Sequence, residues 1–201
     1  MHERLRSGDV GRPREFDDAA VVDAAMDVFW SKGYESTSTE DLCVRTGLGR
    51  GSLYNAFGSK RGLYERVLRR YAEVGFGAQA EILERPGPLK QRLRALMVAV
   101  IETDLGDPVK RGCLAVNAAV DAGGTDDVVA DQVLRQFSRF EAAVREAIAC
   151  GQRDGEVAAD VDPSVAARVF VSAYYGLRVL GKVVRDRRVL EDVVEGALAR
   201  L

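Results

Sequence analysis

Apolar residues recur every three or four positions along almost the whole chain, with polar residues between them. In the stretch from 60 to 84, for example, Leu63, Val67 and Val74 fall on one side of a helix. No stretch alternates apolar and polar residues in the manner of a β-strand. The pattern predicts an all-α chain of about nine helices. Their expected ranges, caps included, are 17–32, 38–47, 50–57, 60–84, 89–105, 112–122, 126–150, 163–185 and 189–201.

The segment from 38 to 60 differs from the rest because its helices are short. Ser38 is placed to cap the first of them, and Asp41 three residues later completes a capping-box pattern. Gly47 is well suited to the position directly after that helix, because glycine accepts a positive φ. A second short helix follows a tight turn, and Ser59 can cap a third helix that opens with Lys60. Two short helices joined by a tight turn predict a helix-turn-helix.

The second short helix has one apolar and one polar face. Leu53 and Phe57, four residues apart, can share the buried face. The residues expected at its N-terminal and solvent-facing end are Arg50, Gly51, Ser52, Tyr54 and Asn55. Donors, acceptors and small residues of this kind are what a helix needs to read base edges in a major groove. The alternative is a polar outer face on an ordinary helical hairpin.

The charge is distributed unevenly along the chain. The formal net charge is −2, which is unexpected for a nucleic-acid-binding protein. Between Arg45 and Arg70, however, seven cations stand against one anion, whereas eight anions stand against one cation between Glu15 and Asp41. The overall value therefore hides a predicted basic patch over the helix-turn-helix, as phosphate binding requires.

Composition argues against enzymes, metal sites and cofactors. The one histidine, His2, lies close to the N-terminus, and no nucleophile, phosphate-binding or dinucleotide-binding motif is found. The cysteines Cys43, Cys113 and Cys150 have no metal-ligand spacing and read as reduced thiols. We therefore predict no catalytic residue, no metal and no cofactor. No apolar run is long enough to span a membrane and no signal peptide is recognisable, so a cytoplasmic location is expected.

From Phe16 to about Tyr71 the chain resembles the DNA-binding domain of the TetR family of transcriptional regulators. The matching residues, about a quarter of the chain in extent, are Ala24, Phe29, Gly33, Tyr34, Ser38, Leu42, Gly47, Leu53, Tyr54, Phe57, Ser59, Lys60 and Leu63. Three positions depart from the family pattern. Gly49 replaces a capping side chain and implies a weaker N-cap, while Cys43 and Ala56 replace an alanine and a larger or polar residue.

The resemblance implies a division of labour along the chain. Residues 1–15 would form a flexible basic arm, 16–62 the helix-turn-helix DNA-binding domain, and 63–201 a helical domain for effector binding and dimerisation. Two interpretations of the arm remain open. It either contacts a minor groove or a phosphate of DNA, or it is a solvated tail. The family places the lysine equivalent to Lys60 on a DNA phosphate. The candidate DNA-binding residues are Ser38, Thr39, Arg50, Gly51, Ser52, Tyr54, Asn55 and Lys60.

The C-terminal domain is expected to hold an apolar cavity bordered by helices at 89–105, 112–122, 126–150 and 163–185. Candidate lining residues for a small apolar effector are Met97, Cys113, Asn117, Phe137, Phe140 and Tyr174. Asn117 could orient a ligand or bond a neighbouring backbone carbonyl, and Cys113 could be a redox sensor or an inert thiol. The family dimerises through its last two long helices, so we expect a homodimer through 163–201, with Phe170, Leu177 and Val194 near the seam.

These expectations predict a sequence-specific DNA-binding transcriptional regulator. The predicted protein is a repressor that binds a palindromic double-stranded operator and is released from it by a small-molecule effector. The alternative is an activating or architectural DNA-binding protein without an effector.

Overall fold

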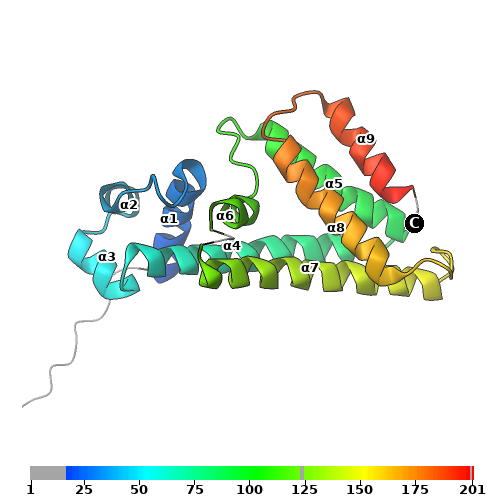
Figure 1. Ribbon diagram of the computed structural model, residues 1–201, viewed down its shortest axis with the longest axis horizontal. Coiled ribbons are helices and arrows are strands. Elements are labelled where there is room, and N and C mark those ends of the chain that lie inside the picture. The colour runs from blue at the N-terminus through cyan, green and yellow to red at the C-terminus, as the bar shows by residue number, and fades with distance from the viewer. Residues whose placement is uncertain (1–16, 123–124, 200) are drawn as a thin grey trace, which may run out of the picture.

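The computed structural model describes residues 17–122, 125–199 and 201, and in these residues it contains nine helices and no strand (Figure 1). The all-α prediction is confirmed. The helices are α1 (Asp18–Lys32), α2 (Thr39–Thr46), α3 (Arg50–Phe57), α4 (Lys60–Leu83), α5 (Leu89–Gly106), α6 (Leu114–Ala122), α7 (Asp127–Arg153), α8 (Pro163–Leu180) and α9 (Arg187–Leu198). The predicted arm, 1–15, lies outside the described residues.

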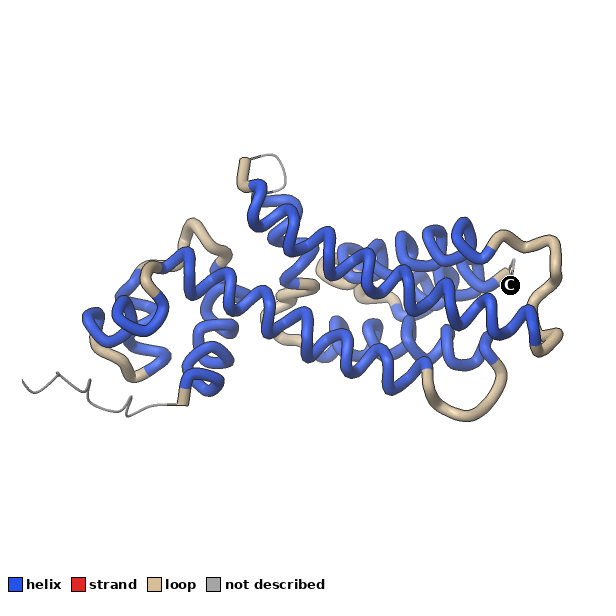
Figure 2. The backbone as a smooth tube through the Cα atoms, turned by 90° about the horizontal axis from the view of Figure 1, so that it is seen from below, coloured by secondary structure: helices blue, strands red, loops and turns tan. Residues whose placement is uncertain are grey.

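Two long helices, α4 and α7, run side by side along the molecule (Figures 1 and 2). Helices α1, α2 and α3 gather around the first turns of α4, while α5, α8 and α9 cover the other end of the pair. The short helix α6 lies between the two groups. Because α4 passes from one group into the other without interruption, the predicted boundary at 62/63 falls inside this helix.

Local sequence signals produce the helix-turn-helix as predicted. The Ser38 hydroxyl accepts a hydrogen bond from the backbone N–H of Asp41, and the Asp41 carboxylate accepts one from the backbone N–H of Ser38. This reciprocal capping box fixes the start of α2. Gly47 ends α2 with a φ of 72°, in the left-handed region that favours glycine. Gly49, as expected, gives α3 no side-chain cap, and Ser59 caps α4.

The buried residues form two clusters. One joins α1–α4 to α6 and the beginning of α7, through residues such as Leu53, Leu114 and Val133. The other joins α5, α8 and α9 to the remainder of α7, through residues such as Met97 and Phe140. The core around the helix-turn-helix thus includes part of the C-terminal region. A displacement of α6 or of the start of α7 would therefore also displace residues of the helix-turn-helix that pack against them.

Several predicted helix ends were wrong. Helix α6 begins at Leu114 and not at 112, because Gly112 adopts a φ of 66°, which is incompatible with a right-handed helix. Helix α7 continues to Arg153, and α8 ends at Leu180, where Gly181 begins a turn. None of the helices in the described ranges is long and apolar enough to cross a membrane.

Candidate DNA-binding surface and ligand cavity

The N-terminal half of α3 is exposed, and its apolar side anchors it. Leu53 and Phe57 are buried beneath the helix, as predicted. On its other side Arg50, Gly51, Ser52 and Asn55 are exposed, and Tyr54 is half-buried. No side chain caps this helix, so its first backbone N–H groups are also available to an anion. A helix seated in this way can present its N-terminal end to a nucleic acid groove.

Tyr54 and Thr39 connect the two helices of the motif. Their hydroxyl oxygens are 2.8 Å apart, and either one can donate the hydrogen bond. The bond from Thr39 is the main cause that lowers the pKa of Tyr54. The Arg50 guanidinium lies 5.8 Å from the centre of the Tyr54 ring. Tyr54 therefore braces α3 against α2, and the Arg50 guanidinium lies over its ring.

Lys60 is also engaged within the protein, which the sequence did not predict. Its ammonium donates hydrogen bonds to the backbone carbonyls of Tyr34 and Thr37, each 2.9 Å long, and lies 4.3 Å from the centre of the Tyr34 ring. An ammonium has three N–H donors, so one remains for a phosphate. Lys60 holds the loop between α1 and α2 in place, and its phosphate contact stays a prediction.

Ser38 is occupied by its capping box. Its hydroxyl donates to the Asp41 carboxylate at 2.9 Å, and the same carboxylate accepts a hydrogen bond from Lys32 at 2.5 Å. The Lys32 bond is the main cause that lowers the pKa of Asp41 to about 2. The first role of Ser38 is thus to fix the start of α2.

The predicted basic patch is partly neutralised by ion pairs, most of them with acids that are distant in sequence. The ion pairs join Arg45 to Asp27, Arg61 to Glu65 and Asp126, Arg66 to Asp18, and Arg70 to Asp23. Arg50 makes no ion pair with any residue that the structure describes. The same is true of the exposed Arg69 on α4, so Arg50 and Arg69, together with the remaining N–H of Lys60, carry the positive charge that is open to a phosphate.

A cavity of about 690 Å³ lies between α1, α4, α5 and α8. Its walls are largely apolar and include Val74, Ala78, Ile82, Leu96, Ala99 and Val100. Residues Met26 and Trp30 of α1 also line it, which places part of the DNA-binding domain in the cavity wall. Helices α1 and α4 were not predicted as walls of the cavity. The signal was present in α1, where Met26 and Trp30 stand four apart beside the acidic positions 23 and 27.

The predicted cavity residues divide into two groups. Cys113 and Tyr174 line the cavity, as expected. Met97 and Phe140 do not line it, because both are packed in the core. Phe137 is not among the lining residues and packs against Tyr175, with the ring centres 4.2 Å apart and the ring planes tilted by 38°. Asn117 lies outside as well, because its amide donates to the Arg111 carbonyl at 3.0 Å and accepts from Lys182. This is the bond to a neighbouring backbone carbonyl that one of the two interpretations of Asn117 expects.

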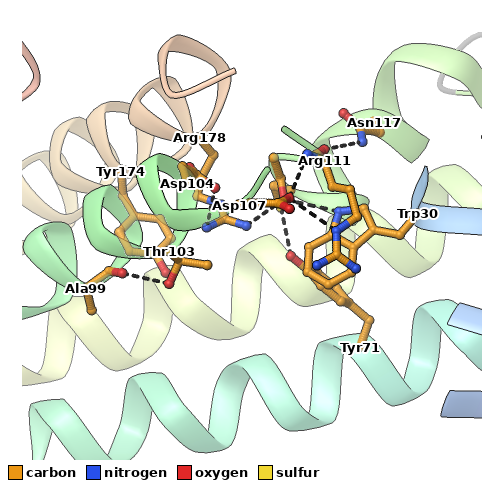
Figure 3. Close-up of polar contacts among 12 residues, drawn as sticks. Trp30, Tyr71, Ala99, Thr103, Asp104, Asp107, Arg111, Asn117, Tyr174 and Arg178 are labelled. Atoms are coloured by element: carbon orange, nitrogen blue, oxygen red, sulfur yellow. Dashed lines mark hydrogen bonds and ion pairs between the residues drawn. The ribbon is translucent and has the colours of Figure 1, made fainter. Parts of the chain in front are cut away.

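Three tyrosines, Tyr71, Tyr174 and Tyr175, line the cavity at one end, and Figure 3 shows the first two. The Tyr174 hydroxyl accepts from Gln79 at 3.1 Å, and the Tyr71 hydroxyl donates to the Cys113 sulfur at 3.5 Å. The Tyr175 hydroxyl is buried and has no hydrogen-bond partner among the residues that the structure describes. Burial raises the pKa of all three phenols, so they are neutral donors at physiological pH. This end suits a ligand that brings a hydrogen-bond acceptor.

A buried ion pair stands beside this end. The guanidinium of Arg178 lies 3.0 Å from one carboxylate oxygen of Asp104, and both side chains are almost fully buried. Burial raises the pKa of Asp104 to about 6, although Arg178 acts in the opposite direction. The second carboxylate oxygen of Asp104 is buried and accepts no hydrogen bond from any of the described residues. In the described part of the chain, no group of His, Cys, Asp and Glu side chains could hold a metal ion.

The prediction of which residues on α8 and α9 lie at the dimer seam was wrong. Phe170, Leu177 and Val194 are 0%, 2% and 1% exposed, because they form the protomer's own core. The exposed apolar residues of this region lie on another face of α8, in the turn that follows it and on α9. They are Val165, Val169, Val179, Val183 and Val189. Gly176 lies on the same side of α8, with no atom near the position of a Cβ, so a second copy could approach closely there.

Comparison with known proteins identifies relatives along almost the whole chain. Residues 21–67 match the family described as bacterial regulatory proteins, tetR family, and residues 78–197 match the tetracyclin repressor-like C-terminal domain. The uncharacterized HTH-type transcriptional regulator YezE of Bacillus subtilis (strain 168) is 33% identical over 96% of this chain and 100% of its own length. The HTH-type transcriptional repressor DhaR of Mycobacterium sp. (strain GP1) is 27% identical over 86% of this chain and 85% of its own.

A solved structure with the same fold contains DNA. It is the TetR family transcriptional regulator CifR, solved as a cysteine mutant in complex with a 26-bp double-stranded operator. The two chains are 33% identical, and the match has a TM-score of 0.82 and covers 94% of this chain and 98% of that one.

Proposed function

Because this chain belongs to the TetR family of bacterial regulatory proteins, we propose that it is a transcriptional repressor. It binds a palindromic operator through α3, and a small ligand releases it from that operator. The family consists of DNA-binding transcriptional regulators, which act as homodimers, and not of enzymes. The proposal assigns 16–62 to DNA binding and 63–201 to effector binding and dimerisation. A protein that regulates chromosomal genes works in the cytoplasm.

One observation carries the DNA-binding proposal, namely the exposed polar end of α3 above a fully buried Leu53. Arg50 and Asn55 are the candidates for base reading, because a guanidinium and a carboxamide can each pair with a purine edge through two hydrogen bonds. Gly51 and Ser52 allow close approach to the groove. Ser38, Thr39, Tyr54 and Lys60 would then contact the sugar-phosphate backbone and fix the register of α3.

The dimer sets the form of the operator. We propose that the exposed valines of α8, of the turn after it and of α9 form the seam between two copies within 163–201. Since a two-fold dimer presents two identical α3 helices, the operator should be a near-palindrome. Its half-sites should lie about one helical turn apart, roughly 34–36 Å from centre to centre.

The cavity carries the effector part of the proposal. Its apolar walls and its phenolic donors suit a compact, mainly apolar molecule with a hydrogen-bond acceptor. Such a ligand would touch α1, α4, α5 and α8 together, so it can favour one arrangement of these helices over another. A ligand shifts this equilibrium only by its difference in affinity for the two arrangements.

The test is a selection of duplexes from a random library, followed by binding titrations of the selected duplex and a scrambled one across a salt series. Arg50→Ala and Asn55→Ala should each cost on the order of 1–3 kcal/mol on the selected duplex and much less on the scrambled one. Equal losses on both duplexes would refute base reading by these residues. Failure of the wild-type protein to enrich any sequence would refute the proposed function.

A further inference from the structure

The loop between α5 and α6, residues 107–113, is fastened tightly to the end of α8. Gly112 has a φ of 66°, and a Cβ atom at this position would lie 2.8 Å from the Lys182 side chain and 3.1 Å from the Arg178 carbonyl. The Arg178 guanidinium donates a 2.6 Å hydrogen bond to the Gly112 carbonyl. The loop therefore has little freedom to move relative to the C-terminal domain.

The same loop is fastened to α1 on its other side (Figure 3). The indole N–H of Trp30 donates to the Gly112 carbonyl at 3.1 Å, so this carbonyl joins α1 and α8. The Arg111 guanidinium lies 4.6 Å from the centre of the Trp30 ring and 3.5 Å from one Asp27 oxygen. Asp107 orients Arg111 by accepting hydrogen bonds from its backbone N–H at 2.8 Å and from its side chain at 3.1 Å.

The contacts continue into the helix-turn-helix. The second oxygen of Asp27 accepts a 2.6 Å hydrogen bond from Arg45, which belongs to α2. Asp27 thus lies between Arg111 of the C-terminal domain and Arg45 of the DNA-binding motif. A continuous series of contacts runs from α8 through the loop and α1 to α2, separate from the covalent connection that α4 provides.

We propose that Arg111 and Trp30 are positioning residues that set the angle of the helix-turn-helix relative to the dimerisation domain. Helix α4 alone is a single connection, and it contains Gly75 and Gly77, which weaken a helix. Because the DNA-binding domain is attached both through α4 and through the contact of α1 with the 107–113 loop, it cannot rotate freely about either attachment. In the dimer, this second attachment fixes the distance between the two α3 helices and hence the preferred spacing of half-sites.

Exposure separates this role from a role in stability. The side chains of Arg111 and Asp27 are 28% and 47% exposed, and ion pairs as exposed as this contribute little to the free energy of unfolding. Their geometry, however, decides where α1 lies. The inference rests on the proposed function, because half-site spacing has meaning only for a dimer on a palindrome.

The experiment measures spacing discrimination by fluorescence anisotropy. The probes are the duplex selected by the wild-type protein and two derivatives with one base pair inserted or removed between the half-sites. The variants are Arg111→Met and Trp30→Phe, which keeps an aromatic ring but removes the indole donor. Arg153→Met is the matched control, because it removes one arginine from an exposed ion pair with Glu146 at the far end of α7.

We expect the wild-type protein and Arg153→Met to discriminate equally against altered spacing. Arg111→Met and Trp30→Phe should lower that discrimination by about three- to tenfold, a range common for residues that couple distant parts of a protein. Arg111→Lys keeps a positive charge opposite Asp27 and should therefore retain part of the discrimination against altered spacing. Base preference within a half-site should be unchanged in every variant.

Unchanged spacing discrimination in both Arg111→Met and Trp30→Phe would overturn the inference. So would a parallel loss of affinity for all three duplexes with the wild-type ratio preserved, because that result indicates general destabilisation. If the wild-type protein selects no palindrome, the proposed function itself fails, and this outcome is distinguishable from failure of the positioning role.

Discussion

The buried pair of Asp104 and Arg178 gives a quantitative prediction about stability. Their side chains are 4% and 7% exposed and meet at 3.0 Å. Arg178→Met preserves most of the volume but leaves the Asp104 carboxylate buried without a counterion. Removing one partner of a buried pair costs about 3–5 kcal/mol of unfolding free energy at neutral pH. Asp104→Asn together with Arg178→Met removes both charges and should recover most of that loss.

The effect should depend on pH with a defined sign. Burial raises the pKa of Asp104 to about 6 in the folded protein, from 3.8 in the unfolded chain. The folded state therefore binds this proton more tightly, and the stabilisation by protonated Asp104 is complete below about pH 4 and lost as pH rises through 6. The difference corresponds to about 3 kcal/mol. In Arg178→Met the pKa rises further, so the acid is neutral at pH 5 and the part of the loss due to its charge, at most about 2 kcal/mol at pH 7.5, should be absent there. The part due to the lost Arg178 hydrogen bond to the Gly112 carbonyl should remain at both pH values.

Guanidinium unfolding followed by tryptophan fluorescence can measure this, because Trp30 is the single tryptophan of the chain. Titrations at pH 5.0 and pH 7.5 should use one protein concentration, since dimerisation contributes to apparent stability. Arg187→Met, which breaks an exposed pair with Glu102, is the control and should have little effect at either pH. A loss in Arg178→Met that is as large at pH 5.0 as at pH 7.5 would show that the buried carboxylate is not its cause.

Three further predictions concern the motif and the seam. Ser38→Ala removes the cap of α2 and should cost about 1 kcal/mol of stability, measured by thermal unfolding; an unchanged midpoint would contradict the role of the capping box. Lys60→Met should weaken binding to every duplex; a salt slope lower by about one indicates a phosphate contact, and an unchanged slope indicates that Lys60 acts only by bracing the α1–α2 loop. Val169→Glu places a charge on the exposed valine face and should give monomers in sedimentation at micromolar concentration, whereas Glu191→Lys on α9 serves as the surface control; a dimeric Val169→Glu would place the seam elsewhere.

The helix-turn-helix could be predicted in detail because its determinants are local. Ser38 and Asp41 cap each other within one helical turn, and Gly47 supplies the positive φ that ends α2. Leu53 and Phe57 show by spacing alone which side of α3 is buried. Such signals need no knowledge of the rest of the fold.

The seam and the cavity depended on contacts that spacing does not encode. Helix α8 carries apolar residues on two sides, and the fold buries the side with the larger residues Phe170 and Leu177 while leaving Val165 and Val169 exposed. Periodicity shows that both stripes exist but not which one meets α5 and α7. Lys60 likewise gave no sign that its partners would be two backbone carbonyls.

The position of the cavity bears on how a ligand can release DNA. Moving a regulator from 1% to 99% in one state needs a ligand that prefers that state by about 10⁴-fold. A ligand confined to the C-terminal domain would have to obtain this preference indirectly, through α4, the shared core around Leu114 and Val133, and the 107–113 loop. In this protein Trp30 both lines the cavity and holds the Gly112 carbonyl, so an occupant of the cavity meets the second attachment directly. A ligand that displaces the indole would free α1 from the loop, while one that packs against it would hold α1 in place. The same cavity could therefore accept one molecule that releases the operator and another that strengthens binding to it.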